Sequence, residues 1–246
     1  MTPIMSIAGL GGPTPSFTKN AGGGEASFAW KYHMHGSTMG GIKLYWMTSS
    51  SSSPVDDGTL NELTFTRDGT TGQTVIGPGQ QQTDETSAWK DGSADLSDYW
   101  GQTGRIAFLY YKTPEGYRGD AGLDNMAITI NGVTTNLNEG TSSGTSTLWW
   151  TVTSYGDSYS SIANCVSDFE ASNLSWTRCV DVAVNNDGGA FLKNDNGTGS
   201  GSTGPSQSAR GGTGYYYIYA ETSNNAGMDN NANRYAFLLS NEFTLS

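Results

Sequence analysis

Two histidines placed two residues apart are the first candidates for chemistry in this sequence. His33 and His35 lie within the segment YHMHG. On a β-strand, residues at positions i and i+2 project from the same face, because successive side chains alternate. The two imidazoles could therefore bind a transition metal if a third ligand approached from elsewhere in the chain. The alternative is that both histidines pack as strand residues, and this structural role is the one we expect.

Paired carboxylates are the next candidates, because glycosidases use two Asp or Glu side chains that flank the glycosidic bond. The closely spaced acids are Asp56 with Asp57, Asp84 with Glu85, and Asp120 with Asp124. They lie in turn-like sequence, without the E-x-D-x-E spacing that would place several acids on one strand face. An H-E-x-x-H zinc motif and a Walker-type phosphate loop are also absent from the sequence. We therefore expect no enzymatic activity.

Alternating apolar residues predict the strands that must position these side chains. Ile42, Leu44 and Trp46 share one face of an expected strand. The same alternation recurs in Ile106, Phe108 and Tyr110, and again in Ile128 and Ile130. Near the C-terminus, the residues Tyr215, Tyr217 and Tyr219 alternate with Tyr216 and Ile218. Because both faces of that segment are apolar, we expect it to be a central strand.

The composition predicts one all-β domain. The chain has 246 residues, which suits a single sandwich, and its 34 glycines and many Ser, Thr and Asn residues favour short strands joined by tight turns. The net charge is −11 and the 12 Lys and Arg residues are scattered. This charge distribution argues against electrostatic binding of nucleic acid, because contacts to phosphates need clustered Lys and Arg residues. No segment approaches the apolar length of a transmembrane helix, so we expect no membrane insertion.

Several short motifs resemble one known family. They are FAWKYHMHGSTMGGIKLYW at 28–46, GYRGDAGLDNM at 116–126, DFEASNLSW at 168–176, STGPS at 202–206, GYYYIYAE at 214–221 and AFLLS at 236–240. Together they resemble the MAM domain, an extracellular β-sandwich module. The first two motifs resemble the second half of that domain and the other four its first half. The resemblance implies an antiparallel jelly-roll sandwich that is circularly permuted, or one that is completed between subunits.

This order of halves predicts the domain organisation. We expect an N-terminal arm at 1–24, the family's second half at 25–130, a connection at 131–167 and its first half at 168–246. The connection is longer than a permutation needs, and its apolar run 148–152 predicts an added strand or a cover for a sheet edge. We favour closure of the sandwich within one chain. Exchange of halves between chains would instead build rings or filaments.

The resemblance also implies an ion site. The residues that match the family's oxygen ligands are Glu170, Asp120, Asp124 and Asn125. Such a cluster suits Ca²⁺, which prefers carboxylate, amide and carbonyl oxygens, or Na⁺. A further family acid falls near Ser208, so this chain lacks one carboxylate. The alternative is that Asp120 and Asp124 accept hydrogen bonds in a turn and orient Arg118.

The only two cysteines, Cys165 and Cys179, are a candidate disulfide. Members of the family carry a disulfide near this place, and Cys165 lies close to the family position, whereas Cys179 lies beyond Trp176. A bridge between them would close a loop of about 15 residues and contribute roughly 3 kcal/mol to stability. The alternative is two free thiols in a protein that folds in a reducing compartment.

The resemblance implies contact with other proteins, because MAM domains mediate adhesion and oligomerisation. The first residues lack a basic region followed by an apolar core, so we do not read them as a signal peptide. We therefore expect a non-enzymatic structural or adhesion protein in a virion, such as a phage decoration, neck or fibre component, and otherwise an extracellular protein. Its partners would be other virion or surface proteins and further copies of itself.

The alternative function is that of a carbohydrate-binding module. In such modules aromatic rings stack on sugar faces, while Asn and Asp side chains bind sugar hydroxyls. The candidate tryptophans are Trp89, Trp100, Trp149 and Trp150. Core packing is the competing role for each of them, since large aromatic side chains dominate sandwich cores.

Overall fold

The structure is a computed structural model of the 246-residue chain. It describes residues 23–48, 60–111, 118–137, 150–155, 166–167, 190–194, 197–198, 201–209, 217–221, 235–240 and 242–246. The sequence predictions for Glu170, Cys165, Cys179 and Trp149 therefore fall outside the described residues.

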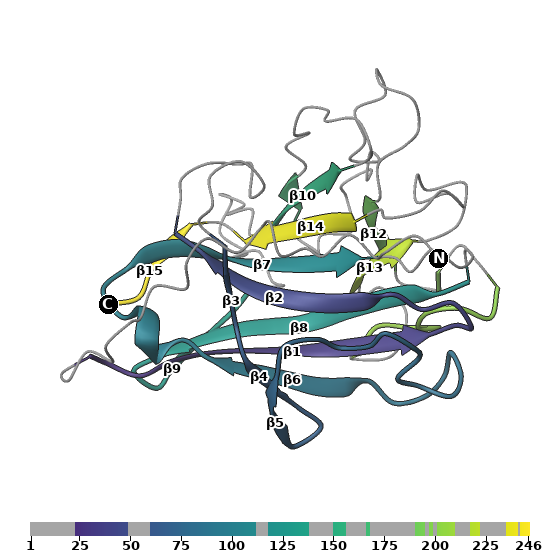
Figure 1. Ribbon diagram of the computed structural model, residues 1–246, viewed down its shortest axis with the longest axis horizontal. Coiled ribbons are helices and arrows are strands. Elements are labelled where there is room, and N and C mark those ends of the chain that lie inside the picture. The colour runs from purple at the N-terminus through teal and green to yellow at the C-terminus, as the bar shows by residue number, and fades with distance from the viewer. Residues whose placement is uncertain are drawn as a thin grey trace, which may run out of the picture.

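Two antiparallel sheets form the molecule (Figure 1). In order across the first sheet, called sheet A here, the strands are β12 (Ala190–Asn194), β13 (Tyr217–Glu221), β8 (Asp120–Ile130), β1 (Ala26–His35), β6 (Lys90–Asp95), β4 (Phe65–Arg67) and β5 (Thr70–Gln73), and β9 (Val133–Asn136) also pairs with β8. Sheet B contains β11 (Val166–Ser167), β10 (Trp150–Tyr155), β14 (Tyr235–Ser240), β7 (Thr103–Tyr111), β2 (Gly41–Met47) and β3 (Leu60–Glu62), with β15 (Phe243–Thr244) paired to β7. A short 3-10 helix, η2, spans Ser97–Tyr99. The prediction of an all-β sandwich is confirmed.

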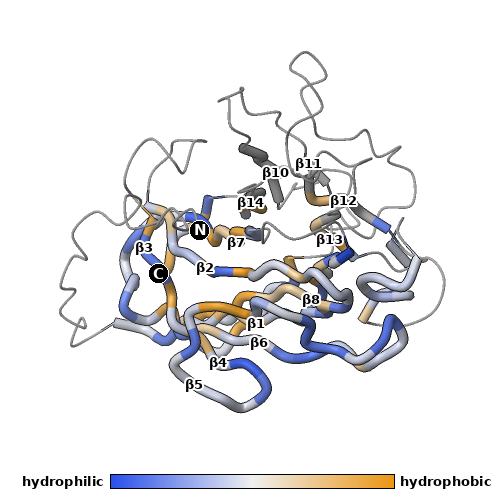
Figure 2. Tube along the Cα trace, turned by 45° about the vertical axis from the view of Figure 1, so that its right-hand side comes forward, coloured by the Kyte–Doolittle hydropathy of each residue, from blue (hydrophilic) through white to orange (hydrophobic). Residues whose placement is uncertain are grey.

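Aromatic side chains from both sheets meet in the core. The ring centroid of Phe108 on β7 lies 5.7 Å from that of Phe28 and 5.5 Å from that of Trp30, and both of these residues are on β1. The predicted alternation is confirmed, because the core cluster contains Ile42, Leu44, Trp46, Ile106, Phe108, Tyr110 and Ile128. Figure 2 shows hydrophobic residues concentrated in β1 and its neighbours, whereas the β4–β5 hairpin is hydrophilic.

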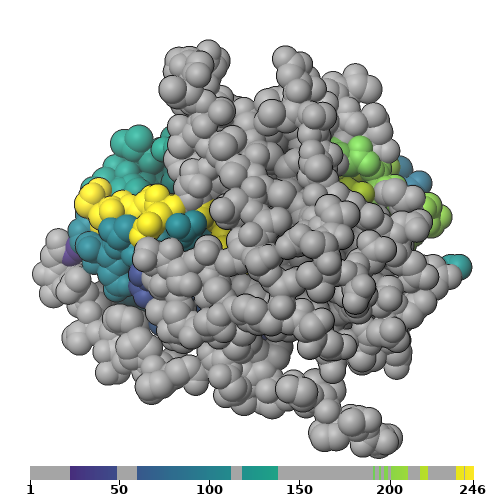
Figure 3. Space-filling model, turned by 90° about the horizontal axis from the view of Figure 1, so that it is seen from above, coloured from purple at the N-terminus to yellow at the C-terminus, as the bar shows by residue number. Residues whose placement is uncertain are grey.

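Strands from the C-terminal part of the chain complete both sheets. β13 lies between β12 and β8, as expected for a central strand, and β14 lies between β10 and β7. β10, which contains the end of the apolar run 148–152, is the predicted added strand and covers the edge of β14. In Figure 3 the yellow C-terminal residues and the green residues near 200 lie at opposite ends of one face.

Two tight turns fix the registers of short hairpins. Asp68 and Gly69 join β4 to β5 with φ values of 45° and 77°. Asn131 and Gly132 join β8 to β9 with φ values of 48° and 78°. Asn-Gly and Asp-Gly pairs adopt positive φ at low cost, and their twist matches that of the strands they connect. The sequence thus determines both hairpins locally.

Within the described residues, no helix is both long and apolar enough to cross a membrane.

The contact between Gly92 and Trp30 generates a prediction about stability. A Cβ atom at Gly92 on β6 would overlap the Trp30 indole, whereas one at Gly201 would meet nothing within 4 Å. We expect Gly92→Ala to lower the free energy of unfolding by about 1–3 kcal/mol, because overpacking strains a filled core. Gly201→Ala serves as the control and should change it by less than about 0.5 kcal/mol. Urea titration measures both values. Equal effects would contradict the packing of Gly92 on Trp30.

Candidate functional site

The outer face of sheet A carries a second buried layer above β1 and β8. On this face His33 lies opposite Gly122, and His35 lies opposite Asp120. Two segments cover them, the loop 83–89 and the segment 201–209, which is called the strap below. The Trp89 site is the region where this loop and the strap meet over the sheet.

Two buried carboxylates of β8 hold the strap. Asp120 accepts a hydrogen bond of 2.6 Å from the hydroxyl of Thr203, and Asp124 accepts one of 2.7 Å from the amide of Ala209. Asp124 also accepts a bond from the backbone N–H of Asn125 at 2.7 Å. Both acids are fully buried. Both acids accept hydrogen bonds, as the alternative expected, but they lie on a strand and not in a turn, because the pairing of β1 with β8 runs through both positions. That they orient Arg118 stays a prediction.

The predicted ion site is only partly covered by the described residues. Asp120, Asp124 and Asn125 are described, whereas Glu170 is not. Positions 120 and 124 of an extended strand are roughly 13 Å apart, so each carboxylate binds a different end of the strap. Among the described residues no group of three His, Cys, Asp or Glu side chains is arranged to hold a metal. Ca²⁺ or Na⁺ binding that involves Glu170 stays a prediction.

Trp89 is wedged between the sheet and the strap. Its indole N–H donates to the carbonyl of Gln207 at 3.1 Å. The centroid of the indole ring lies 5.6 Å from the ring centroids of both His33 and Tyr217. Gly122 leaves the space that the indole occupies, since a Cβ there would come within 2.8 Å of Trp89 Cη2. These contacts fix the orientation of Trp89.

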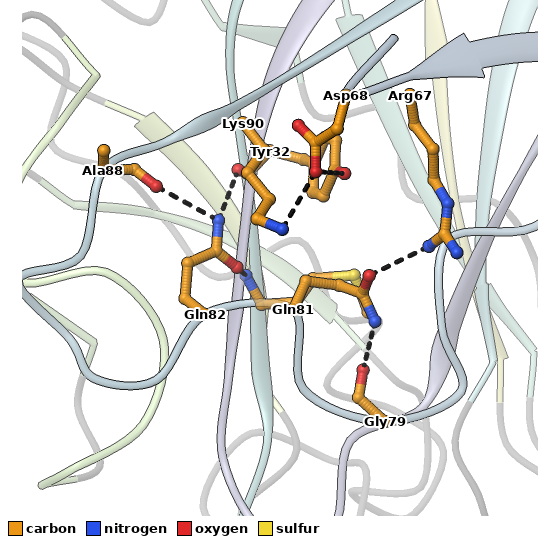
Figure 4. A network of polar contacts seen from close by, with 9 residues as sticks. Tyr32, Arg67, Asp68, Gly79, Gln81, Gln82, Ala88 and Lys90 are labelled. Carbon is orange, nitrogen blue, oxygen red and sulfur yellow. Dashed lines mark hydrogen bonds and ion pairs between the residues drawn. The ribbon is translucent and has the colours of Figure 1, made fainter. Parts of the chain in front are cut away.

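Gln82 anchors the loop that carries Trp89 (Figure 4). Its side-chain oxygen accepts from the N–H of Met34 at 2.7 Å, and its amide nitrogen donates to the carbonyl of Tyr32 at 3.1 Å. Pairing of β1 with β6 ends at Tyr32. The Gln82 side chain therefore takes the place of a neighbouring strand along this part of the β1 edge. The side chain of Gln82 is buried, which the local sequence does not indicate.

Polar contacts tie the same loop to the β4–β5 hairpin. Arg67 donates to the side-chain oxygen of Gln81 at 2.9 Å, and Gln81 donates to the carbonyl of Gly79 at 2.9 Å. Lys90 forms an ion pair of 2.9 Å with Asp68. Figure 4 shows these groups converging on the start of the loop. The loop thus has fixed supports on two sides.

A pocket of about 330 Å³ opens beside Trp89. Residues 85–89 form one wall, residues 207–209 form the other, and Lys31 of β1 contributes a third side. The walls are joined by a hydrogen bond of 2.8 Å from the N–H of Ser206 to the carbonyl of Glu85. Sequence reasoning identified Trp89 but missed the rest of the lining. No motif marks those residues, since Trp89 and Gln207 are 118 positions apart.

The other candidate tryptophans have different surroundings. Trp100 packs against the core, and Gly23 and Gly24 cross over its indole, so it has a structural role. The backbone of Trp150 belongs to β10, while its side chain and all of Trp149 lie outside what is described. Among the described tryptophans, Trp89 is the one that lines this pocket.

His33 lies behind Trp89 with no exposed surface. Neither ring nitrogen makes a hydrogen bond of regular geometry within the described part of the chain, although the backbone of Asp84 and Ser87 lies close to the ring. Burial, together with the neighbouring His35, lowers the pKa of His33 to about 4, while Asp84 and the nearby backbone of Ser87 oppose the shift. The ring is therefore neutral near pH 7 and packs against Trp89 as an apolar side chain would.

The chain matches no family model, no curated protein and no solved structure. The MAM resemblance therefore rests on the short motifs alone. Four of those motifs contribute to the outer face of sheet A, through β1, β8, the strap and β13.

The strap contacts predict the effect of removing one carboxylate. We expect Asp124→Ala to lower the free energy of unfolding by about 2–3 kcal/mol, because charge-assisted bonds to two N–H groups are lost at a buried position. The exposed Asp98 gives a control, and Asp98→Ala should cost less than about 0.5 kcal/mol. Hydrogen exchange should also accelerate at the amide of Ala209. Unchanged protection of that amide would show that Asp124 does not hold the strap.

The burial of His33 predicts a dependence of stability on pH. Its pKa is lowered in the folded state, so the unfolded chain binds the proton first as the pH falls below about 6.5. The contribution to stability is complete above that pH and is lost toward pH 4, to a total of about 3 kcal/mol. His33→Phe keeps an aromatic ring and removes the titration. Urea titrations at pH 7 and pH 4 should show a smaller loss for the variant. Parallel curves for both proteins would contradict a buried neutral His33.

Proposed function

We propose that this protein is a non-catalytic structural and adhesion module, either of a virion or of the extracellular space. The observation that carries the proposal is the preformed outer surface at the Trp89 site. Two chain segments are held there on the sheet. Asp120 and Asp124 accept buried hydrogen bonds from the strap, and Gln82 accepts one from the N–H of Met34. A surface ordered before contact loses little conformational entropy on binding, which favours recognition.

The MAM resemblance with permuted halves is part of this proposal. It is supported by the way the motifs meet in space, since the YHMHG strand pairs with the strand of the G-D-x-x-L-D motif. The STGPS motif lies in the strap and is bonded to that second strand through Thr203. Motifs that are distant in the chain thus form one continuous surface. Assembly into homo-oligomers, or with other virion or surface proteins, follows from the role of such modules in adhesion.

The second candidate function is carbohydrate binding. The pocket beside Trp89 is the specific observation that favours it, because it joins an indole to side chains that can bind hydroxyls. Both candidates act by binding, and they differ in the partner.

The assembly proposal predicts the mass of the protein in solution. We expect a defined multimer, measured by size-exclusion chromatography with light scattering, whose mass stays constant through a dilution series. A monomer at every concentration would contradict homo-oligomeric assembly.

A further inference from the structure

The pocket beside Trp89 has the size of a small-ligand site, and hydrogen bonds join its two walls. Its volume of about 330 Å³ lies at the lower end of the range of ligand pockets. The bond from Trp89 to Gln207 and that from Ser206 to Glu85 join its two walls. Asp124 holds the end of the strap through Ala209. The pocket is thus formed before any ligand arrives.

The lining combines one aromatic wall with a ring of polar groups. Trp89 contributes the apolar surface, and it is neither fully exposed nor fully buried. Around it lie the hydroxyl residues Thr86 and Ser87 and the charged residues Glu85 and Lys31. Carboxylates accept hydrogen bonds only, ammonium groups donate only, and hydroxyls do both. This set matches a ligand that has an apolar face bordered by hydroxyl groups.

The charges at the pocket argue for a neutral ligand. The ammonium group of Lys31 is 2.6 Å from the carboxylate of Asp91, so its charge is already compensated. Glu85 adds a negative charge at the wall, and the whole chain carries a net charge of −11. These charges repel phosphate, sulfate and carboxylate groups. An entirely apolar ligand is disfavoured too, because it would desolvate Glu85 and Lys31 without replacing their hydrogen bonds.

One buried polar atom in the wall points to the same class of ligand. The hydroxyl of Ser208 is buried and has no hydrogen-bond partner among the described residues, although Ser208 lines the pocket. An unpaired buried hydroxyl destabilises the structure that contains it. A hydroxyl-rich ligand beside the strap offers such partners, and a hydrocarbon does not.

We infer that this pocket binds a neutral pyranose sugar, with Trp89 against the apolar face of the ring and Glu85 and Lys31 on its hydroxyls. The inference rests on the carbohydrate-binding candidate and names its ligand class and its site. It places the contacts of an adhesion module on a terminal or exposed sugar of a surface glycan.

The test uses the full chain and immobilised oligosaccharides that end in glucose, galactose, mannose or N-acetylglucosamine, with sialylated and sulfated oligosaccharides alongside. We expect binding to at least one neutral sugar and none to the acidic ones. Saturation-transfer NMR with the corresponding free monosaccharide then measures the contact in solution. Absence of binding to every neutral sugar at millimolar concentration would overturn the inference, and so would exclusive binding of the acidic ones.

Matched variants locate the site. Glu85→Ala removes an exposed wall carboxylate and should weaken binding at least tenfold, whereas Glu62→Ala, at the edge of sheet B, should leave it unchanged. Trp89→Phe keeps an aromatic ring but loses the bond to Gln207, and it should also weaken binding. Each variant is first checked for a native near-ultraviolet circular dichroism spectrum. Sugar binding that survives both pocket variants in folded protein would overturn the assignment.

The same samples separate this inference from the proposal of assembly. The mass in a dilution series reports on multimers, whereas binding to the oligosaccharides reports on the pocket. Multimers without sugar binding would overturn the inference alone. Sugar binding by a monomer would support the inference and contradict homo-oligomeric assembly.

Discussion

The constraint on which the rest of the structure depends is that the centre of sheet A is buried on both faces. Along β1 the inward residues, including Tyr32 and Met34, pack into the sandwich core, and outward-facing His33 is buried as well. Water does not cover the outer face around His33, although it reaches Ser27 and Ala29 farther along β1, so other parts of the chain must cover His33. The loop 83–89 and the strap provide that cover. Their backbone groups need partners, since a buried amide or carbonyl without one is costly.

The partners that the chain uses explain why the outer surface is fixed. Buried carboxylates accept strong hydrogen bonds from N–H and hydroxyl donors, and Asp120 and Asp124 do so at either end of the strap. Gln82 uses both ends of its amide to continue the β1 ladder where β6 stops. Because these polar groups are buried, breaking one contact would leave another group unsatisfied. These hydrogen bonds fix the positions of the two walls of the pocket beside Trp89. A binding site that is ordered in advance loses less conformational entropy when it binds.

The sequence predicted the regular parts of the fold because they depend on local periodicity. The alternation at Ile42, Leu44 and Trp46 indicated which residues face the core, and the two apolar faces of the segment near Tyr217 indicated a central strand. Sequence reasoning failed where one residue type can occupy two kinds of structural position. Asp120 and Asp124 were expected in a turn if they bound no ion, because acids are common in turns, yet they lie in β8. The local sequence does not distinguish an Asp that accepts a hydrogen bond from a distant segment from an Asp that accepts one within a turn.

By itself, the sequence determined the fold class, the hairpins at Asp68-Gly69 and Asn131-Gly132, and the faces of the main strands. These depend on side-chain alternation and on the backbone preferences of neighbouring residues. The tertiary structure alone decided that Trp89 rather than Trp100 lines a pocket, and that Gln82 and Asp124 position its walls. The reason is physical, since the pocket forms between residues 118 positions apart and exists only once both segments cover the same face of sheet A.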